Sequence, residues 1–268
     1  MGRIEATFAR LRAAGETALI PFITAGDPSL AVSETLIHAM VEAGADIVEL
    51  GVPFSDPMAD GPTIQAASER ALRAGTTLSG VLQMVARVRL HTNVPIVLMG
   101  YFNPVFRYGA ERFARDAAAA GVDGVLLVDL PPEEAAEIHG ALAAADLRLI
   151  TLLAPTTPPQ RQARLAASGE GYLYYVSMTG VTGSQAVDAA AIAAAVTALR
   201  EQSPVPVAVG FGITTAADAA AIGSFADGVV VGSALVRIIE SCATSAELLP
   251  EVRRFISGLK AGLGKSPA

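Results

Sequence analysis

A closed (β/α)8 TIM barrel with eight parallel strands and an extra N-terminal helix is the fold that this sequence predicts, as one domain over residues 1–268. Eight short runs are nearly continuous in apolar residues, as strands covered on both faces of a parallel sheet are. Helical patterns lie between the runs, and no change of composition marks a linker. An open doubly wound sheet is the alternative arrangement.

The expected strands follow one another at intervals that leave room for a helix. They are TALIPFIT (17–24), ADIVEL (45–50), PIVLMG (95–100), DGVLLVD (123–129), LRLITLLA (147–154), YLYYVS (172–177), PVAVG (206–210) and DGVVVG (227–232). In the segment 78–90, Leu78, Val81, Leu82 and Val85 form one helical stripe. Ser, Thr, Asp and Pro begin several of the expected helices, in the segments DPSLA, PPEEAAE, TTPPQRQA and TTAADAAAIG.

Composition narrows the possible partners and compartments. The chain is 52% hydrophobic, carries a formal net charge of -7, and has no Lys/Arg cluster that would follow a nucleic acid backbone. Its N-terminal segment does not resemble a signal peptide, and no apolar run is long enough to cross a bilayer. The single cysteine, Cys242, excludes an internal disulfide. We therefore expect a cytoplasmic protein that binds neither nucleic acid nor membrane.

Two acidic residues are the strongest candidates for catalysis. Glu49 lies near the end of the second run, where a barrel places its working residues, and it shares a strand face with Ile47. Partial removal from water is expected to raise the pKa of Glu49 and to let it exchange a proton near neutral pH. A structural ion pair is the other interpretation of Glu49. Asp60, in the long Pro-rich segment that follows, is either a helix cap or a second catalytic acid.

Glycines at the ends of three late strands predict a phosphate site. They occur in SMTGVTGS (177–184), AVGFGI (208–213) and VVVGSAL (229–235). Glycine lets a ligand approach backbone N–H groups, and a helix starting after Ser233 would add the positive end of its dipole. Barrels often build such a site from the loops after their seventh and eighth strands.

Metal and Schiff-base chemistry are not predicted. His38, His91 and His139 fall in expected helices or at their ends, without metal-ligand spacing. No lysine lies at the end of an expected strand, where a covalent aldolase would need one.

Seven motifs in register resemble the tryptophan synthase alpha subunit family over nearly the whole chain. They are PFITAGDP (21–28), ELGVPFSDPMADGPTIQ (49–65), MGYFNPV (99–105), DLPPEE (129–134), LLAPTTP (152–158), GVTG (180–183) and VGFGI (209–213). The resemblance implies a lyase that splits indole-3-glycerol phosphate into indole and D-glyceraldehyde 3-phosphate by a retro-aldol reaction, without a cofactor.

The resemblance also implies residue roles. Glu49 would be the acid/base that moves the protons, and Asp60 would accept from the indole N–H and stabilise the positive intermediate. The expected substrate-binding residues are Phe22, Ile64, Leu98 and Leu126, which would form an apolar indole pocket, together with Tyr174 and Thr182. The expected phosphate-binding residues are Gly183, Phe211, Gly212, Gly232 and Ser233.

A partner subunit is implied as well. In the family, the loop from Pro53 to Asp60 and the loop from Met178 to Val187 close over the substrate, and Thr182 contacts Asp60 on closure. The same face docks a beta subunit, which carries pyridoxal phosphate, in an expected alpha2beta2 heterotetramer. Two alternatives remain: a stand-alone indole-3-glycerol-phosphate lyase, and a non-catalytic activator of a beta partner.

Overall fold

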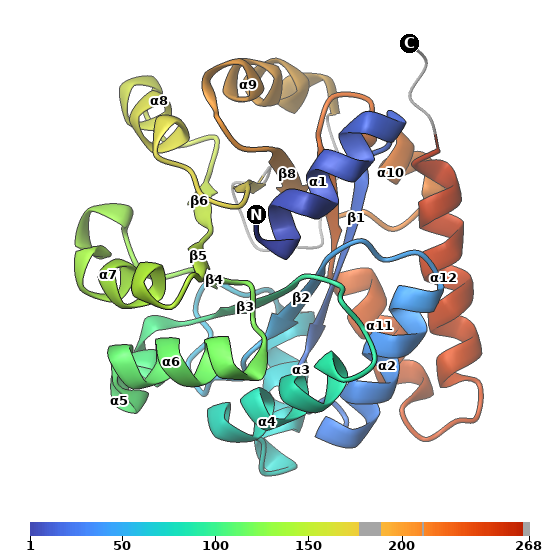
Figure 1. The fold of residues 1–268 in the computed structure, drawn as a ribbon. Coiled ribbons are helices and arrows are strands. Elements are labelled where there is room, and N and C mark those ends of the chain that lie inside the picture. Colours follow the sequence, from blue (N-terminus) through green and yellow to red (C-terminus); the bar gives the residue numbers. More distant parts are fainter. Residues whose placement is uncertain (177–188, 211, 265–268) are drawn as a thin grey trace.

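The computed structural model describes residues 1–176, 189–210 and 212–264, with the side chains of 189–191 outside that description. In these residues all strand pairs are parallel, and their order around the sheet is β5-β4-β3-β2-β1-β9-β8-β7-β6 (Figure 1). The strands are β1 (Ala18–Thr24), β2 (Val48–Gly51), β3 (Ile96–Gly100), β4 (Gly124–Leu127), β5 (Arg148–Leu149), β6 (Thr151–Leu153), β7 (Leu173–Val176), β8 (Val207–Gly210) and β9 (Gly228–Val231).

The sheet closes into a barrel through the fifth predicted strand. This strand is divided into β5, which pairs with β4, and β6, which pairs with β7. Only Ile150 lies between them, and its N–H donates to the carbonyl of Val125 over 2.8 Å. One continuous segment therefore joins the two ends of the strand order. The barrel prediction is confirmed, and the open sheet is excluded.

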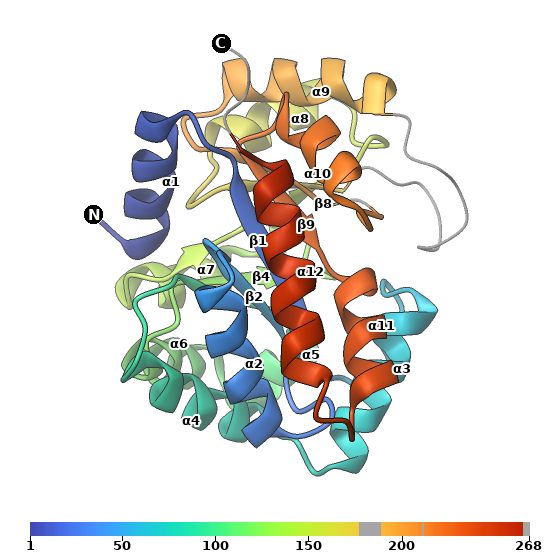
Figure 2. The same cartoon turned by 90° about the vertical axis from the view of Figure 1, so that its right-hand side faces the viewer.

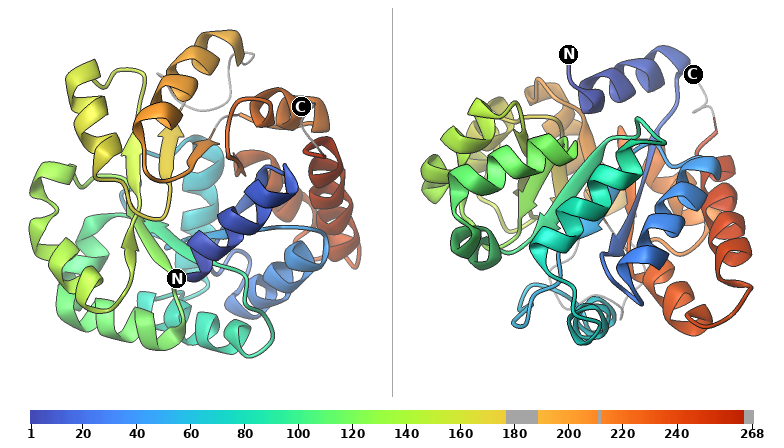
Figure 3. Two further views of the ribbon diagram at one scale, coloured as in Figure 1. Left: turned by 45° about the horizontal axis from the view of Figure 1, so that its top comes forward. Right: turned by 60° about the horizontal axis from the view of Figure 1, so that its bottom comes forward.

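Helices surround the strands (Figures 2 and 3). They are α1 (Arg3–Ala14), α2 (Leu30–Glu42), α3 (Pro62–Arg73), α4 (Leu78–Arg89), α5 (Phe102–Tyr108), α6 (Ala110–Ala120), the short 3-10 helix η1 (Pro132–Glu134), α7 (Ala136–Ala144), α8 (Pro159–Ala167), α9 (Ala189–Gln202), α10 (Ala216–Gly223), α11 (Ser233–Cys242) and α12 (Leu248–Gly262). Several predicted helix starts are confirmed: the Ser29 hydroxyl accepts from the N–H of Val32, and Thr215 and Asp218 form a capping box at α10.

The extra N-terminal helix covers the end of the barrel where the strands begin (Figure 3, left). Its Ile4, Phe8 and Leu11 are buried in one cluster with inward-facing strand residues such as Ile20 and Ile47. Burial of these side chains excludes water from the amino-terminal end of the strands. The opposite, carboxyl end of the strands is left for the site.

Acidic residues join neighbouring strands at this amino-terminal end. Asp46, Asp123, Glu170 and Asp227 come just before β2, β4, β7 and β9. Each carboxylate accepts a backbone N–H from an earlier strand. Asp46 accepts that of Leu19 over 3.0 Å, and Asp123 accepts that of Ile96 over 2.8 Å. Glu170 accepts that of Leu149 over 3.3 Å, and Asp227 accepts that of Val207 over 2.9 Å. Each acid also pairs with a basic side chain. Asp46 pairs with Lys260 and Arg10, and Asp123 pairs with Arg89 and Arg3. Glu170 pairs with His139, and Asp227 pairs with Arg200. These contacts tie strands together in pairs and hold their register.

Strand residues alternate between two apolar layers. Val48 and Leu50 belong to the cluster between sheet and helices, whereas Ile47 belongs to the cluster inside the barrel. Glu49 therefore faces the interior, as its position in the sequence predicts.

Candidate active site

Glu49 is wholly buried inside the barrel. The Tyr172 hydroxyl, from the strand run that continues as β7, donates to Glu49 Oε1 over 2.7 Å. Within the described residues the second oxygen, Oε2, has no partner. Burial raises the pKa of Glu49 to about 8, and the bond from Tyr172 lowers it only in part. No Lys or Arg in the described part of the chain pairs with Glu49, so the ion-pair interpretation of Glu49 is not supported. At neutral pH the carboxyl group holds its proton.

Asp60 lies at the end of the loop that joins β2 to α3. The Tyr101 hydroxyl donates to Asp60 Oδ2 over 3.1 Å and accepts the N–H of Ala59 over 2.9 Å. Gln65 Nε2 also donates to the carbonyl of Asp60 over 2.8 Å, which ties the loop to α3. Burial raises the pKa of Asp60 to about 6, and the bond from Tyr101 opposes that rise. Asp60 therefore remains mostly ionised at pH 7.

The helix-cap interpretation of Asp60 is not what the structure shows. The N-cap position of α3 is Gly61, and no side chain makes a capping bond there. The Asp60 carboxylate is directed to Tyr101 instead. The charge of Asp60 is thus held by a side chain from the end of β3, the strand next to the one that carries Glu49.

Tyr174 lies on the same inner surface of the barrel as Glu49. Its ring lies inside the barrel, and the charges of both Glu49 and Asp60 raise its pKa further after burial has raised it well above the ordinary value. Tyr174 shares its strand face with Tyr172, whose hydroxyl contacts Glu49.

The predicted apolar contacts divide into two groups. Phe22 lies in a small buried cluster against which Ile64 packs, and Leu126 lies inside the barrel. Leu98 does not join them: it belongs to the layer between sheet and helices. The neighbouring residue, Met99, packs against both inner clusters. Because side chains alternate along a strand, Met99 and not Leu98 occupies the interior.

The predicted phosphate-binding residues are described only in part. Gly232 is the N-cap of α11, and Ser233 is its first residue, so backbone N–H groups at this helix start are directed toward the carboxyl end of β9. Gly212 follows β8 and is exposed. Thr182, Gly183 and Phe211 lie outside the described residues, as does the loop 178–187.

A cavity of about 600 Å³ lies between α7 and α8 and the ends of β4, β5 and β6. Leu127, Leu149, His139 and Arg161 are among its lining residues, but neither Glu49 nor Asp60 is. The cavity is large enough for a small molecule, but it does not contain the two candidate catalytic acids.

Among the described residues, no helix has the length and apolar character needed to cross a membrane. In the same part of the chain, no group of three or more His, Cys, Asp or Glu is placed to hold a metal ion. The three histidines lie in α2, after α4 and in α7, as expected.

Sequence reasoning missed two hydroxyl groups that contact the acids, those of Tyr172 and Tyr101. A weak signal existed for Tyr172, because it lies two residues before Tyr174 and so shares its strand face. Tyr101 follows directly after the third strand, where barrel site residues occur. Neither position, however, reveals which carboxyl group the hydroxyl contacts.

Comparison with known proteins decides the family. The model of the family described as "Tryptophan synthase alpha chain" matches residues 8–262. The chain belongs to the tryptophan synthase alpha chain family. It is 56% identical over 265 residues to the tryptophan synthase alpha chain of Geobacter sp. (strain M21), covering 99% of each chain. It is 57% identical to that of Geobacter sulfurreducens, covering 98% of this chain and 100% of the relative.

Solved tryptophan synthase structures have the same fold. The alpha subunit from Legionella pneumophila str. Paris superposes with a TM-score of 0.91 at 41% identity, covering 98% of each chain. A tryptophan synthase chain from Mycobacterium tuberculosis superposes with a TM-score of 0.89 at 39% identity, also covering 98% of each. The predicted resemblance to the tryptophan synthase alpha chain family is therefore confirmed.

Proposed function

We propose that this chain is a carbon-carbon lyase that splits indole-3-glycerol phosphate into indole and D-glyceraldehyde 3-phosphate, as the alpha subunit of a tryptophan synthase in L-tryptophan biosynthesis. Its whole length would act as one barrel domain, in the cytoplasm. One observation carries the proposal: Glu49 is wholly buried with only the Tyr172 hydroxyl on its carboxyl group, and Asp60 accepts from Tyr101. Burial raises the pKa of Glu49 to about 8 and that of Asp60 to about 6. At pH 7 the first is protonated and the second is charged, which is the pair of states that this cleavage needs.

Glu49 is proposed as the acid/base. Its carboxyl proton is given to indole C3, which leaves C2=N⁺–H in the ring. The carboxylate then takes the proton of the glycerol hydroxyl next to the breaking bond, so that the aldehyde forms. The electrons of the broken C–C bond restore the C2=C3 double bond of indole, and the nitrogen becomes neutral. Every proton and electron pair is accounted for, and no step calls for a cofactor of this chain.

Asp60 is proposed to stabilise the positive charge. An ionised carboxylate accepting from the ring N–H favours the intermediate in which that nitrogen carries the charge. Tyr101 holds the carboxylate in place, and its bond keeps the pKa of Asp60 from rising further. Glu49 and Asp60 thus divide the proton transfer from the charge stabilisation.

Binding of the two ends of the substrate is proposed to use different elements. The indole ring would lie among Phe22, Ile64, Met99, Leu126 and Tyr174, which are the inner apolar residues described above. The phosphate would lie at the start of α11, at Gly232 and Ser233, together with Gly212. Thr182, Gly183 and Phe211 remain proposed contacts on the strength of the family pattern.

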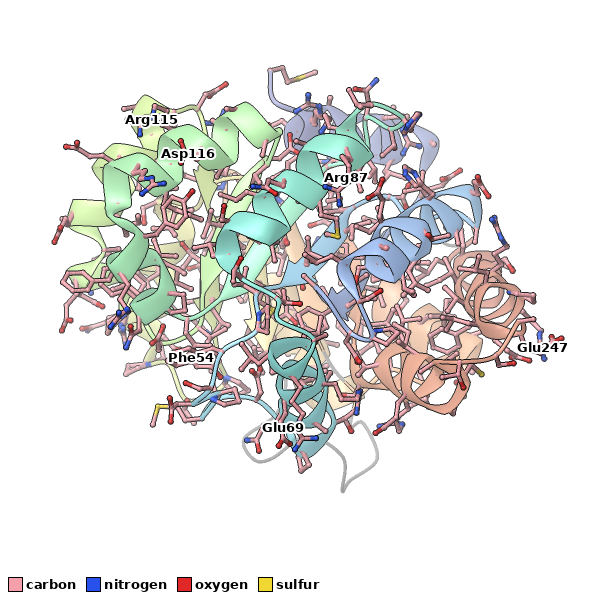
Figure 4. The ribbon with its side chains drawn as sticks, turned by 90° about the horizontal axis from the view of Figure 1, so that it is seen from below. Phe54, Glu69, Arg87, Arg115, Asp116 and Glu247 are labelled. Carbon is pink, nitrogen blue, oxygen red and sulfur yellow. The ribbon has the colours of Figure 1, made fainter. Side chains whose placement is uncertain are left out.

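The same end of the barrel has features of a docking face. Met58 in the loop after β2 and Phe106 on α5 are 85% and 63% exposed. Phe54, labelled in Figure 4, packs on Tyr101 with ring centroids 5.3 Å apart. Exposed apolar side chains at one end favour a partner surface. An alpha chain implies a beta subunit, and we propose an alpha2beta2 assembly in which the beta subunit holds pyridoxal phosphate.

The test is indole release from indole-3-glycerol phosphate by the purified chain, with and without a tryptophan synthase beta subunit. Wild type, Glu49→Gln and the exposed control Glu111→Gln are compared. We expect wild type and the control to release indole faster with the beta subunit, and Glu49→Gln to be inactive in both conditions. Rapid release that ignores the beta subunit would favour the stand-alone lyase. No indole from the wild type in either condition would overturn the catalytic assignment in favour of the activator.

A further inference from the structure

Gly51 ends β2 two residues after Glu49, on the same inner face of the strand. Its φ is not among the positive values found at other glycines, so its backbone conformation is open to any residue. The conformational freedom of glycine therefore does not explain this position. What distinguishes it is the space beside it.

The ring of Phe22 fills that space. A Cβ atom on Gly51 would lie 2.6 Å from Cζ and 2.9 Å from Cε2 of Phe22. Carbon atoms in contact are about 3.5–4.0 Å apart, so the ring would have to move by about 1 Å. At Gly232, on the other side of Phe22, the nearest ring atom would be 3.5 Å from a Cβ, which is an ordinary contact.

Packing restricts the directions in which the Phe22 ring can move. It lies opposite Glu49 in the pairing of β1 with β2, and it is buried with Ala67 of α3 and Val236 of α11. Backing by two helices leaves the barrel mouth as the direction in which the ring can be displaced, because packed interiors resist displacement. A side chain at residue 51 would thus push the ring into the space that the indole ring would occupy.

We propose that Gly51 is a positioning residue, whose missing side chain sets the place of the Phe22 ring and so the room for the indole ring above Glu49. This inference rests on the proposed function. Phe22 would contact indole equally before and during bond cleavage, so misplacing it weakens binding without altering the proton transfers. KM changes in that case, while kcat is largely kept.

The experiment compares cleavage kinetics of wild type, Gly51→Ala, Phe22→Leu and the double variant, all with the beta subunit. We expect Gly51→Ala to raise KM about tenfold or more with kcat within about threefold, because the displaced ring takes room from the indole ring before and during cleavage alike. Leucine lacks Cζ and Cε2, so the double variant should have the KM of Phe22→Leu alone. That non-additivity is the signature of a direct contact.

Gly100→Ala is the matched control. Gly100 ends the neighbouring strand, and a Cβ there would meet only Val52, at 3.4 Å. Its KM should stay within about twofold of wild type. If Gly51→Ala does not fold, the double variant must fold and behave as Phe22→Leu does; failure of both overturns the inference.

The two proposals fail differently. A wild type that releases no indole overturns the proposed function itself. A normal wild type, combined with a Gly51→Ala variant whose KM is unchanged or is not relieved by Phe22→Leu, overturns only the role of Gly51.

Discussion

Replacing Glu49 by glutamine should change how stability depends on pH. Burial raises the pKa of Glu49 from 4.5 to about 8 in the folded chain, so folding favours the neutral acid. The stability that this acid contributes is complete below pH 4.5 and is lost as the pH rises through 8. Glutamine mimics the neutral acid at every pH. The variant should therefore gain stability relative to wild type as the pH increases.

The size of the effect follows from the two pKa values. Each pKa unit corresponds to about 1.4 kcal/mol. Because Glu49 ionises more readily in the unfolded chain, the free energy of unfolding of the wild type should be lower than it would be with a permanently neutral acid. The difference should be less than about 1 kcal/mol at pH 5, about 3 kcal/mol at pH 7 and about 5 kcal/mol at pH 9. The glutamine Nε2 replaces an oxygen that has no partner among the described residues, which adds a constant penalty of about 1–3 kcal/mol. That penalty shifts the curve without changing its slope.

Urea unfolding of wild type, Glu49→Gln and the exposed control Glu111→Gln between pH 5 and pH 9 measures these differences, with unchanged m values as the check on two-state behaviour. The free energy of unfolding of Glu49→Gln minus that of wild type should rise by about 2–3 kcal/mol between pH 5 and pH 7. A difference that stays flat over the whole range would refute the raised pKa. It would also remove the reason for assigning Glu49 as the proton donor.

Three further outcomes are expected. Tyr172→Phe removes the bond that lowers the pKa of Glu49, so the pH profile of kcat should move to higher pH. The control is Tyr175→Phe, because Tyr175 is buried but faces the helices. Tyr101→Phe frees Asp60, so the pKa of Asp60 should rise above about 6 and kcat/KM should fall roughly tenfold; an unchanged kcat/KM would contradict this role. Asp123→Ala leaves the Ile96 N–H and Arg89 without their carboxylate, and urea unfolding should show a loss of about 2–5 kcal/mol. The exposed Glu111→Ala should cost far less, and equal losses in the two variants would show that the contacts of Asp123 do not stabilise the barrel.

Local patterns in the sequence predict much of this protein. Continuous apolar runs separated by capped helices indicate a parallel barrel, because both faces of each strand are covered. The face of Glu49 follows from the alternation of side chains around it, and its burial follows from its place in an apolar run. Motifs in register indicate the family before any coordinate is considered, since each motif occupies a short stretch of chain.

The tertiary structure decides what depends on distant parts of the chain. In the run Ile96–Gly100 every residue before the final glycine is apolar, so hydrophobicity does not tell whether Leu98 or Met99 faces the interior; only the pairing of strands settles this. Tyr172 lies 123 residues from Glu49, and Tyr101 lies 41 residues from Asp60. Because desolvation and hydrogen bonding arise from these long-range neighbours, the sequence identifies the two acids, whereas the folded barrel determines which of them holds a proton.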